Sequence, residues 1–556
     1  MQISSTRNIR FFLFSIISLL YIVTRVVIFK GFNGTDDLHY AMLASNILKG
    51  TYNPFTSGDI FSGRVLLVAW QALIYKVGGI NIFTTQAGTL FAVLLSCYLT
   101  IFKLLQVRSI NAAIIGASLF YFSPVLTNAT KGTLPDIYVV LAGIIVLLLW
   151  NKTLQQTNAR KNILNGAGIG FTIAACMLVK ETALVFFVLI ACLAFFEKTR
   201  QASVTCLAMI VTLLICGSIM AGVYYHYTGD ALYRLQQVQN SNYYNPCSYD
   251  ILPASFLITR LTYGIWKEFI TYGFYPVLFS VAIIVYRLLV DKNFSVFRYK
   301  YIQYFIILLV TGLYFPFSIK GYQPLCSDTR HFLFLLPLGV CISTQYITDD
   351  IEKGTTIKWV LISILSFIAC MLCTPDKWQW MLWCLFILFF IAQKFISPRH
   401  IIAGKAIAFA AILWLCMPYY LFYNNSNWFA GMRQLDKQLT GNHYYFADHD
   451  NMMHWELLHQ FNDSIHCYDM DAYPFKIFQL YYERLDTTAF YPGWLLVNKT
   501  YTERSEGFLH TMDSLQKIHY FNRRIANSDI DAYYIQQPAQ LSFIKNTVEN
   551  DVKVMR

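Results

Sequence analysis

Two adjacent carboxylates follow the first apolar run of the sequence, in the stretch GTDDLHYA at residues 34–41. A carboxylate beside a bilayer is costly unless it is solvated, paired or used in function. Asp36 and Tyr40 are four residues apart, so they share one face of a helix. Either Thr35 or Asp36 caps a juxtamembrane helix, or the acids carry out chemistry. Capping is the simpler explanation for one acid and a weaker one for the pair.

Three further groups of charged residues stand where apolar runs begin or break. An acid in the first turn of a helix is stabilised by the helix dipole, which is common and needs no functional role. The simplest explanation of an adjacent lysine and glutamate is an ion pair between the two. A cation at a helix N-terminus opposes the dipole, so we expect Arg330 to have an anionic partner. The groups are Pro135-Asp136, Lys180-Glu181, and Asp328 with Arg330 and His331.

The apolar runs that must position these residues indicate a membrane protein. The chain is 56% hydrophobic and 13% charged, whereas soluble proteins average about 25% charged residues. We predict a polytopic α-helical protein with about thirteen transmembrane helices, each crossing a hydrocarbon core of about 30 Å. The tracts cover residues 11–30, 83–102, 109–127, 137–150, 163–180, 182–196, 202–225, 269–290, 301–318, 331–347, 358–374, 379–396 and 402–423.

Two segments outside these tracts have their own character. In the first outer loop, 31–82, residues 64–79 are apolar with a tryptophan, a tyrosine and two basic residues, which is typical of a helix in the membrane interface. Residues 424–556 are polar and carry a net charge of −4, against +16 for residues 1–423. We predict a transmembrane domain at 1–423 and a small α/β domain at 424–556. The basic excess belongs to the membrane part and does not indicate nucleic acid.

Basic residues in alternate loops predict the orientation. They place Met1 inside and the C-terminal domain outside, and only residues 348–354 run against this trend. We take the first tract as a retained anchor, because no small-residue cleavage site follows it. All the unusual charges then fall on the outer side, at the ends of spans that are distant in sequence. Such convergence of acids and cations at a membrane–water boundary indicates a candidate functional site.

Cysteines and histidines give weaker signals. Ten of the thirteen cysteines lie in or beside apolar tracts, where cysteine is usually a small hydrophobe. Cys247 and Cys326 fall on the outer side, but spacing alone does not support a disulfide between them. His449, His454 and His459 are spaced by five residues, which takes them off a single helix face. We therefore predict a solvated surface there, and no metal site.

These motifs, in this order, resemble those of the GT-C superfamily of integral-membrane glycosyltransferases. The likeness is to the branch that holds protein O-mannosyltransferases and lipid A aminoarabinose transferases. It covers residues 10–350 by motif, with Asp37 in place of the usual glutamate and His331 in place of the usual tyrosine. The matching elements are DDLHYA at 36–41 with Arg25 eleven residues before it, Arg64 through Gly79, Pro135-Asp136, Lys180-Glu181, YTGDALYR at 227–234 and RHFLFLLP at 330–337.

The resemblance implies transfer of a sugar from a polyprenyl-phosphate donor to a hydroxyl of a lipid, glycan or protein acceptor. The hydroxyl attacks C1, which is inverted, and needs a base, whereas the departing phosphate needs cations. Asp36 fits the base. Lys180 and Arg330 fit the phosphate clamp, with Arg64 and Arg234 as further cations.

The other matched positions take supporting roles. Asp37 and Asp136 would orient the acceptor, and Asp36 with Asp136 would hold a divalent cation if one is used. Tyr40, together with Glu181 and His331, is assigned to substrate binding. No retrieval signal ends the chain, and we expect a bacterial inner membrane with the C-terminal domain in the periplasm.

Two other classes of function remain open. A flippase or transporter for a lipid-linked sugar usually has charges near mid-bilayer and a repeat between its halves, and the sequence shows neither. A glycan-assembly protein without catalysis would not need the acids and cations that are present.

Overall fold

The protein is described here from a computed structural model. The described residues are 2–27, 29, 31–32, 36–56, 59–239, 249, 252–292, 294–316, 322–353, 357–374, 377–395, 402–423, 428–439, 444–469, 493–498, 521–526 and 530–535.

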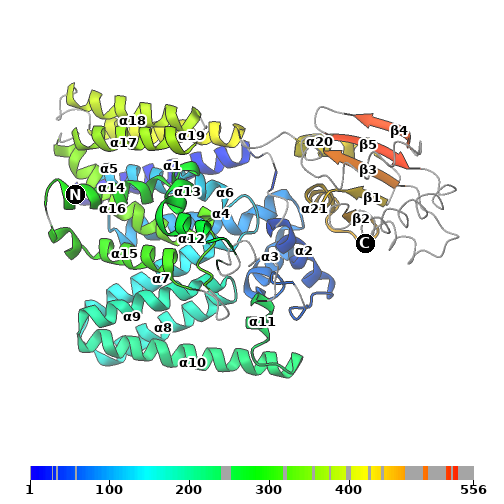
Figure 1. Ribbon diagram of the computed structural model, residues 1–556, viewed down its shortest axis with the longest axis horizontal. Coiled ribbons are helices and arrows are strands. Elements are labelled where there is room, and N and C mark those ends of the chain that lie inside the picture. The colour runs from blue at the N-terminus through cyan, green and yellow to red at the C-terminus, as the bar shows by residue number, and fades with distance from the viewer. Residues whose placement is uncertain are drawn as a thin grey trace.

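A bundle of apolar helices forms the larger part of the molecule (Figure 1). Five described helices are long and apolar enough to cross a membrane, and seven others are apolar but shorter. Each of the thirteen predicted tracts overlaps a helix, which confirms the predicted polytopic helical fold. These helices are α1 (Gln2–Val27), α4 (Ile82–Tyr98), α5 (Ile110–Tyr121), α7 (Asp136–Leu154), α8 (Ala159–Met177), α9 (Val185–Glu197), α10 (Arg200–Thr228), α14 (Tyr275–Leu289), α15 (Lys300–Tyr314), α16 (Leu336–Lys353), α17 (Ile357–Cys373), α18 (Lys377–Phe395) and α19 (Ile402–Tyr423).

Shorter helical segments connect the bundle helices or lie beside them. Among them, α2 and α3 are the helices that the sequence predicts in the first outer loop. The α-helical segments are α2 (Asp36–Lys49), α3 (Val65–Gly78), α6 (Pro124–Asn128), α11 (Tyr233–Gln239), α12 (Ala254–Thr259), α13 (Ile265–Thr271), α20 (Trp428–Asp436) and α21 (His449–Leu458). The 3₁₀ and π segments are η1 (Leu99–Leu104), η2 (Glu181–Leu184), η4 (Arg260–Gly264), η5 (Phe294–Arg298) and η6 (Thr329–Leu335).

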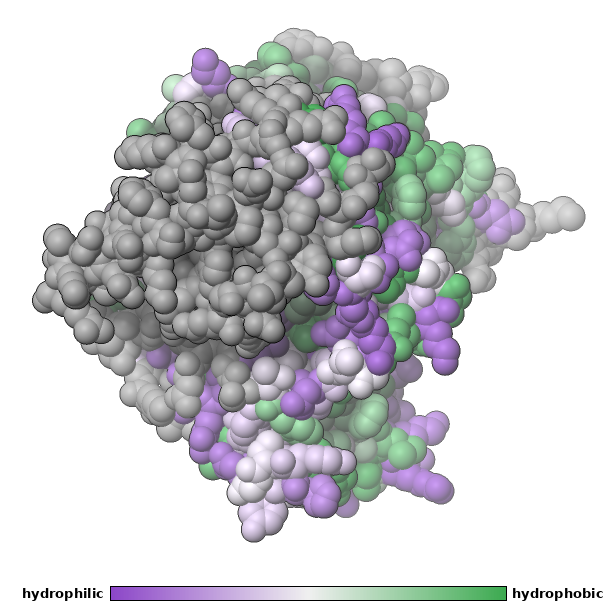
Figure 2. All heavy atoms as spheres, turned by 90° about the vertical axis from the view of Figure 1, so that its right-hand side faces the viewer, coloured by the Kyte–Doolittle hydropathy of each residue, from purple (hydrophilic) through white to green (hydrophobic). Residues whose placement is uncertain are grey.

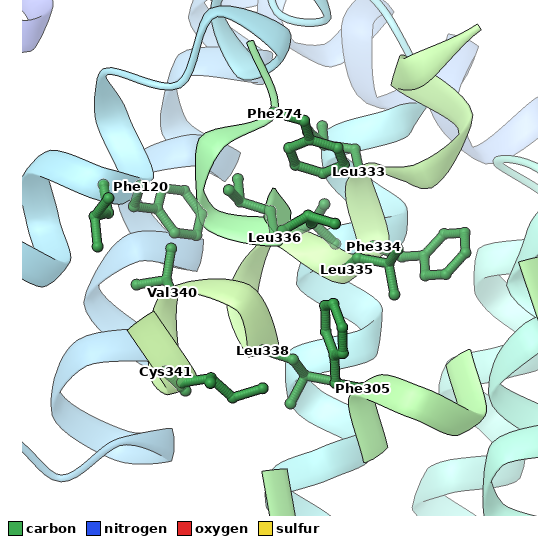
Figure 3. Packing of buried hydrophobic residues seen from close by; sticks show 14 of the residues in the cluster. Phe120, Phe274, Phe305, Leu333, Phe334, Leu335, Leu336, Leu338, Val340 and Cys341 are labelled. Carbon is green, nitrogen blue, oxygen red and sulfur yellow. The ribbon is translucent and has the colours of Figure 1, made fainter. Parts of the chain in front are cut away.

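The centre of the bundle is built by η6 and α16. Most of the apolar window in Thr329–Lys353, 89% of it, is buried, whereas in α10 only 6% is. Figure 3 shows side chains of this segment, among them Leu336, Leu338 and Cys341, packed with Phe120 and Phe305. A helix that is apolar all round belongs in the core or in lipid. Here α16 is in the core, while the exposed apolar side chains of α10 face outward.

Small residues set the distance between α8 and α10. A Cβ atom on Gly170 would lie 2.7 Å from the backbone oxygen of Met209, and one on Gly166 would overlap the backbone at Thr205. Glycines spaced by four let two membrane helices touch through their backbones. The break between α8 and α9 also follows the sequence, since Lys180 has extended backbone angles between them.

A mixed five-stranded sheet follows the last apolar helix. Its strands are β1 (Tyr444–Ala447), β2 (His466–Asp469), β3 (Gly493–Asn498), β4 (Phe521–Ala526) and β5 (Ile530–Ile535), in the order β2-β1-β3-β5-β4. Strand β1 pairs in parallel with β2 and β3, and β5 pairs antiparallel with β3 and β4. With α20 and α21 this is the small α/β unit expected from the sequence.

The first outer loop lies between the bundle and the sheet. In Figure 1, α2, α3 and α11 lie beside the ends of bundle helices, and α21 lies between α2 and the strands. Figure 2 views the end of the molecule that carries the sheet, where hydrophilic residues are prominent among the described ones. Met453, Leu457 and Phe461 at α21 share one buried cluster with Leu38 and Tyr40 of α2.

Two sequence expectations need correction or explanation. The predicted solvated surface is wrong for His454, which is fully buried: its Nε2 accepts a hydrogen bond from the backbone N–H of Phe32 at 3.2 Å. The side chain is buried by apolar residues from other segments, and the spacing of the histidines in the sequence does not predict that burial. The acidic stretch 348–354, which opposes the charge trend, is partly neutralised because Asp350 pairs with Lys358 at 2.7 Å.

One cysteine on the predicted outer side is oxidised. Cys326 is disulfide-bonded, while ten other cysteines are free. Cys247 lies outside the described residues, and with it the Cys247–Cys326 disulfide that the sequence left open.

Candidate functional site

Residues from five separate segments meet at the end of the bundle beside α2. Asp36 begins α2, Arg64 precedes α3 and Asp136 begins α7, while Lys180 ends the break after α8 and Arg330 is in η6. All of them line one small cavity, together with Ile60, Phe61, Pro135 and His331. With Glu181 and Arg234 we call them the charged cluster: Asp36, Arg64, Asp136, Lys180, Glu181, Arg234, Arg330 and His331.

Arg330 has the anionic partners that the sequence predicts. Its Nη2 lies 2.8 Å from Oδ2 of Asp36, and its Nε lies 2.8 Å from Oδ2 of Asp328. Asp328 also accepts a hydrogen bond from the backbone N–H of Arg330, which fixes the start of η6. Asp36 is 23% exposed and Arg330 21% exposed, so this pair remains accessible to a ligand.

Lys180 is paired across the bundle and not with its neighbour in sequence. Its Nζ donates to Oδ1 of Asp136 at 2.5 Å and to Nδ1 of His331 at 2.8 Å. The mutual Lys180–Glu181 ion pair considered from the sequence is therefore wrong. Lys180 and Asp136 are both almost fully buried, and removing one partner of such a pair typically costs about 3–5 kcal/mol. Oδ2 of Asp136 has no hydrogen-bond partner among the described residues.

Glu181 is held between two arginines. Its Oε2 lies 3.4 Å from Nη2 of Arg64, and its Oε1 accepts a short hydrogen bond from Arg234. Burial raises the pKa of Glu181, but the two guanidinium groups together outweigh burial and lower it to about 2. Arg64 also donates to the hydroxyl of Tyr40. Burial raises the pKa of Tyr40, so its hydroxyl keeps its proton at neutral pH.

Helix α11 brings Arg234 to this network. Arg234 also donates to the backbone oxygen of Ile60 at 2.9 Å. Gln237 Nε2 donates to the backbone oxygens of Thr56 and Asp59, at 2.8 and 2.7 Å. The segment after α10 is therefore bonded to the chain before α3, at Thr56, Asp59 and Ile60. Gln237 was missed from the sequence, because a neutral amide next to a charged motif carries no signal of its own.

Asp37 lies apart from the charged cluster. Its side chain is fully buried and lies so close to Gly132 that a Cβ atom there would be 2.7 Å from its Oδ2. Asp37 interacts electrostatically with Lys131, whose pKa is lowered to about 8 by burial and by Arg25. The two adjacent acids of the motif therefore point to different partners, Asp36 to Arg330 and Asp37 towards the segment before α7.

A second titratable pair near the cluster was also missed. His39 Nε2 lies 3.2 Å from Oδ2 of Asp59, and the ring of His39 contacts that of Phe61. His39 is one helical turn after Asp36, so the i,i+3 spacing was the available signal.

A large apolar cavity adjoins the charged cluster. Its volume is about 590 Å³, and its walls come mainly from α10, with further residues from α8, η2, α11 and the segment 323–326. Arg64, Lys180 and His331 line both this cavity and the small one that contains Asp36, while Glu181 and Arg234 line the large one. The arrangement suits a ligand with a long apolar part and an anionic group at one end.

The charged cluster does not fit a divalent cation. The carboxylates of Asp36 and Asp136 are each paired with a basic side chain of the protein. No group of three or more histidine, cysteine or acidic side chains within the described ranges is arranged to hold a metal ion.

Comparisons with known proteins give the fold. No family model matches the chain, and no curated protein matches its sequence. The structure of ArnT from Cupriavidus metallidurans in the apo state aligns with a TM-score of 0.58 and 11% identity, covering 93% of this chain and 97% of that one. ArnT from the same organism bound to undecaprenyl phosphate gives 0.57 and 12%, covering 94% and 97%. The chain has the fold of the GT-C glycosyltransferases and is an integral membrane protein.

Proposed function

We propose that this protein transfers a sugar from a polyprenyl-phosphate donor to an acceptor hydroxyl. The observation that carries the proposal is the junction of the two cavities, where Arg64, Lys180 and His331 line both. A lipid phosphate placed there has cations at its head and the apolar cavity for its tail. The ArnT structure with the same fold is bound to undecaprenyl phosphate, which supports a ligand of this class.

Several cations are in place for the phosphate. Lys180 and Arg330 are the clamp expected from the sequence, and Arg64 and Arg234, the further cations expected there, line the apolar cavity. Both of these arginines form ion pairs with the carboxylate of Glu181. A donor phosphate bound there would need charge-assisted hydrogen bonds from the same two arginines. A phosphate that enters competes with Glu181 for them.

Asp36 is the proposed base. The acceptor oxygen forms a bond to C1 of the sugar, its proton passes to the carboxylate of Asp36, and the C1–oxygen bond to phosphate breaks with its electron pair on the phosphate oxygen. Attack opposite to the departing phosphate inverts C1. Arg330, 2.8 Å from Asp36, places positive charge between base and leaving group. The phosphate needs no proton from a general acid, because cations stabilise its charge.

We place the reaction on the outer side of the membrane. The charged cluster lies at the end of the bundle next to the α/β unit, and Cys326, which lines the apolar cavity, is disulfide-bonded. Disulfides persist in oxidising compartments such as a bacterial periplasm. The charges gather at one end of the helices, which favours an enzyme over a flippase with charges at mid-bilayer.

The proposal is tested by comparing cells that lack the gene with cells that carry the parent gene or its Asp36→Asn variant. Mass spectrometry of envelope lipids and glycoproteins should show a hexose- or pentose-sized addition with the parent only. If the three strains have the same lipids and glycoproteins, the protein is not this transferase.

A further inference from the structure

A second, polar groove lies between the first outer loop and the α/β unit. Its volume is about 280 Å³, and it is separate from the charged cluster, with no lining residue in common. Its lining residues come from α2 and from the chain between the end of α21 and the start of β2. These elements lie side by side in Figure 1. We call it the α2 groove. Its lining residues are Met42, Asn46, Lys49, Glu456, His459, Phe461, Asn462, Asp463, Ile465, His466 and Cys467.

The turn after α21 shapes this groove through an uncommon backbone conformation. Gln460 and Phe461 have φ angles of 59° and 53°, which is rare for a bulky residue. Such conformations persist only where the surroundings enforce them, and they concentrate at functional sites. Here the ring of Phe461 is buried with α2, and Lys49 donates to the backbone oxygen of Phe461 and to Oδ1 of Asp463 at 2.5 Å.

The groove is not suited to an anion. Its cation, Lys49, is already paired with Asp463, and Glu456 adds another negative charge. The lysine charge that a phosphate or carboxylate ligand would need is therefore already compensated, and His459 lies 3.1 Å from the carboxylate of Asp436.

The groove combines amide side chains with an apolar surface. The side-chain amide of Asn46 makes no hydrogen bond to the described residues, and Asn462 uses only its oxygen, which accepts from the backbone N–H of Ser464 at 3.0 Å. Each amide offers donors, and Asn46 also offers its oxygen. Met42, Phe461 and Ile465 supply the apolar surface. An uncharged sugar ring has the matching character, since its hydroxyls donate and accept while its C–H face is apolar.

We propose that the α2 groove binds an uncharged saccharide, the glycan part of the acceptor, an assignment that rests on the function proposed above. The groove and the base are on one rigid element: with a rise of 1.5 Å per residue, Met42 and Lys49 lie about 9 and 20 Å along α2 from Asp36. The acceptor hydroxyl of an oligosaccharide held in the groove would have to reach across about 9–20 Å along α2 to the base.

Binding to an immobilised panel of neutral oligosaccharides tests the proposal with the full-length protein in detergent. We expect at least one to bind the parent. Asn46→Ala, in which alanine favours the helix, and Asn462→Asp, which keeps the acceptor oxygen of the turn, should each weaken binding roughly two- to tenfold, the net worth of one or two hydrogen bonds. Asn53→Asp is the matched control and should bind like the parent, because it likewise keeps the oxygen that accepts from a backbone N–H, that of Phe55, and Asn53 does not line the groove.

The outcomes separate this site from the function. Absence of binding to every oligosaccharide, or equal binding by the parent, Asn46→Ala and Asn462→Asp, overturns the saccharide site. Loss of binding in Asn53→Asp also overturns it, because binding would then not depend on the residues that line the groove. Saccharide binding at the groove by a protein that transfers no sugar would leave the groove as a glycan-binding site and reject the transferase.

Discussion

Replacing Asp36 by asparagine separates a base from a structural residue. Asp36 is 23% exposed, and it forms an ion pair with Arg330 at 2.8 Å. After the change Arg330 still has Asp328, also at 2.8 Å. A partly exposed ion pair is worth about 0–1 kcal/mol, and asparagine begins a helix as well as aspartate does. The variant should therefore fold and keep a free energy of unfolding within about 1 kcal/mol of the parent.

The catalytic role predicts a much larger effect on rate. A positioned base contributes roughly 100- to 10,000-fold, which equals about 2.7–5.4 kcal/mol of activation free energy. This exceeds the worth of the ion pair with Arg330 several times over. The amide of asparagine does not accept a proton near neutral pH, so no part of this contribution survives in Asp36→Asn.

The rate should be measured in a single turnover, with the lipid-linked donor bound before the acceptor is added. Release of polyprenyl phosphate then reports the transfer step, and donor affinity is measured separately. Asp328→Asn is the matched control, since it removes the other carboxylate from Arg330 and should leave the rate within about threefold of the parent. Asp36→Asn that transfers sugar within tenfold of the parent rate would refute the base. Equal losses of transfer rate in Asp36→Asn and Asp328→Asn would show that both carboxylates act by positioning Arg330, and that Asp36 is not the base.

Three further predictions follow from the charged cluster and the charge pattern. Lys180→Met and Arg330→Ala should each weaken donor binding roughly 10- to 150-fold, as loss of a charge-assisted hydrogen bond does; unchanged affinity in titrations with the donor would assign the clamp to other cations. Because the folded-state pKa of Glu181 is about 2, below its usual 4.5, its ion pairs stabilise the protein at neutral pH, and this contribution is lost as the pH falls from 4.5 towards 2. Glu181→Gln should therefore be less stable by roughly 1–3 kcal/mol at pH 7, with the difference closing at low pH in thermal unfolding; a constant difference would contradict the assignment. Topology reporters should read inside, inside and outside, and an inside signal at the third would reverse the proposed orientation; the fusion sites are Gln155, Asp350 and Asn498.

The sequence by itself determined the membrane class, the positions of the helices and the order of the charged motifs. A long apolar run must be buried in the bilayer or in the protein core, so the helices can be located without knowledge of the tertiary structure. The anionic partner of Arg330 was also predictable, because a cation at a helix start requires one. The adjacent acids Asp36 and Asp37 also indicated a functional or capped helix start, because a charge beside lipid is costly unless it is paired or used.

Only the tertiary structure decided which charges meet. Lys180 is adjacent to Glu181 in sequence, yet it pairs with Asp136, because the break between α8 and α9 turns consecutive side chains to different neighbours. Asp37 turns away from Asp36 for a similar reason, since successive residues of a helix point in directions about 100° apart. The burial of His454 and the two cavities beside the charged cluster likewise depend on surfaces from distant segments. Local sequence sets where charge occurs, and packing between distant segments sets its partner.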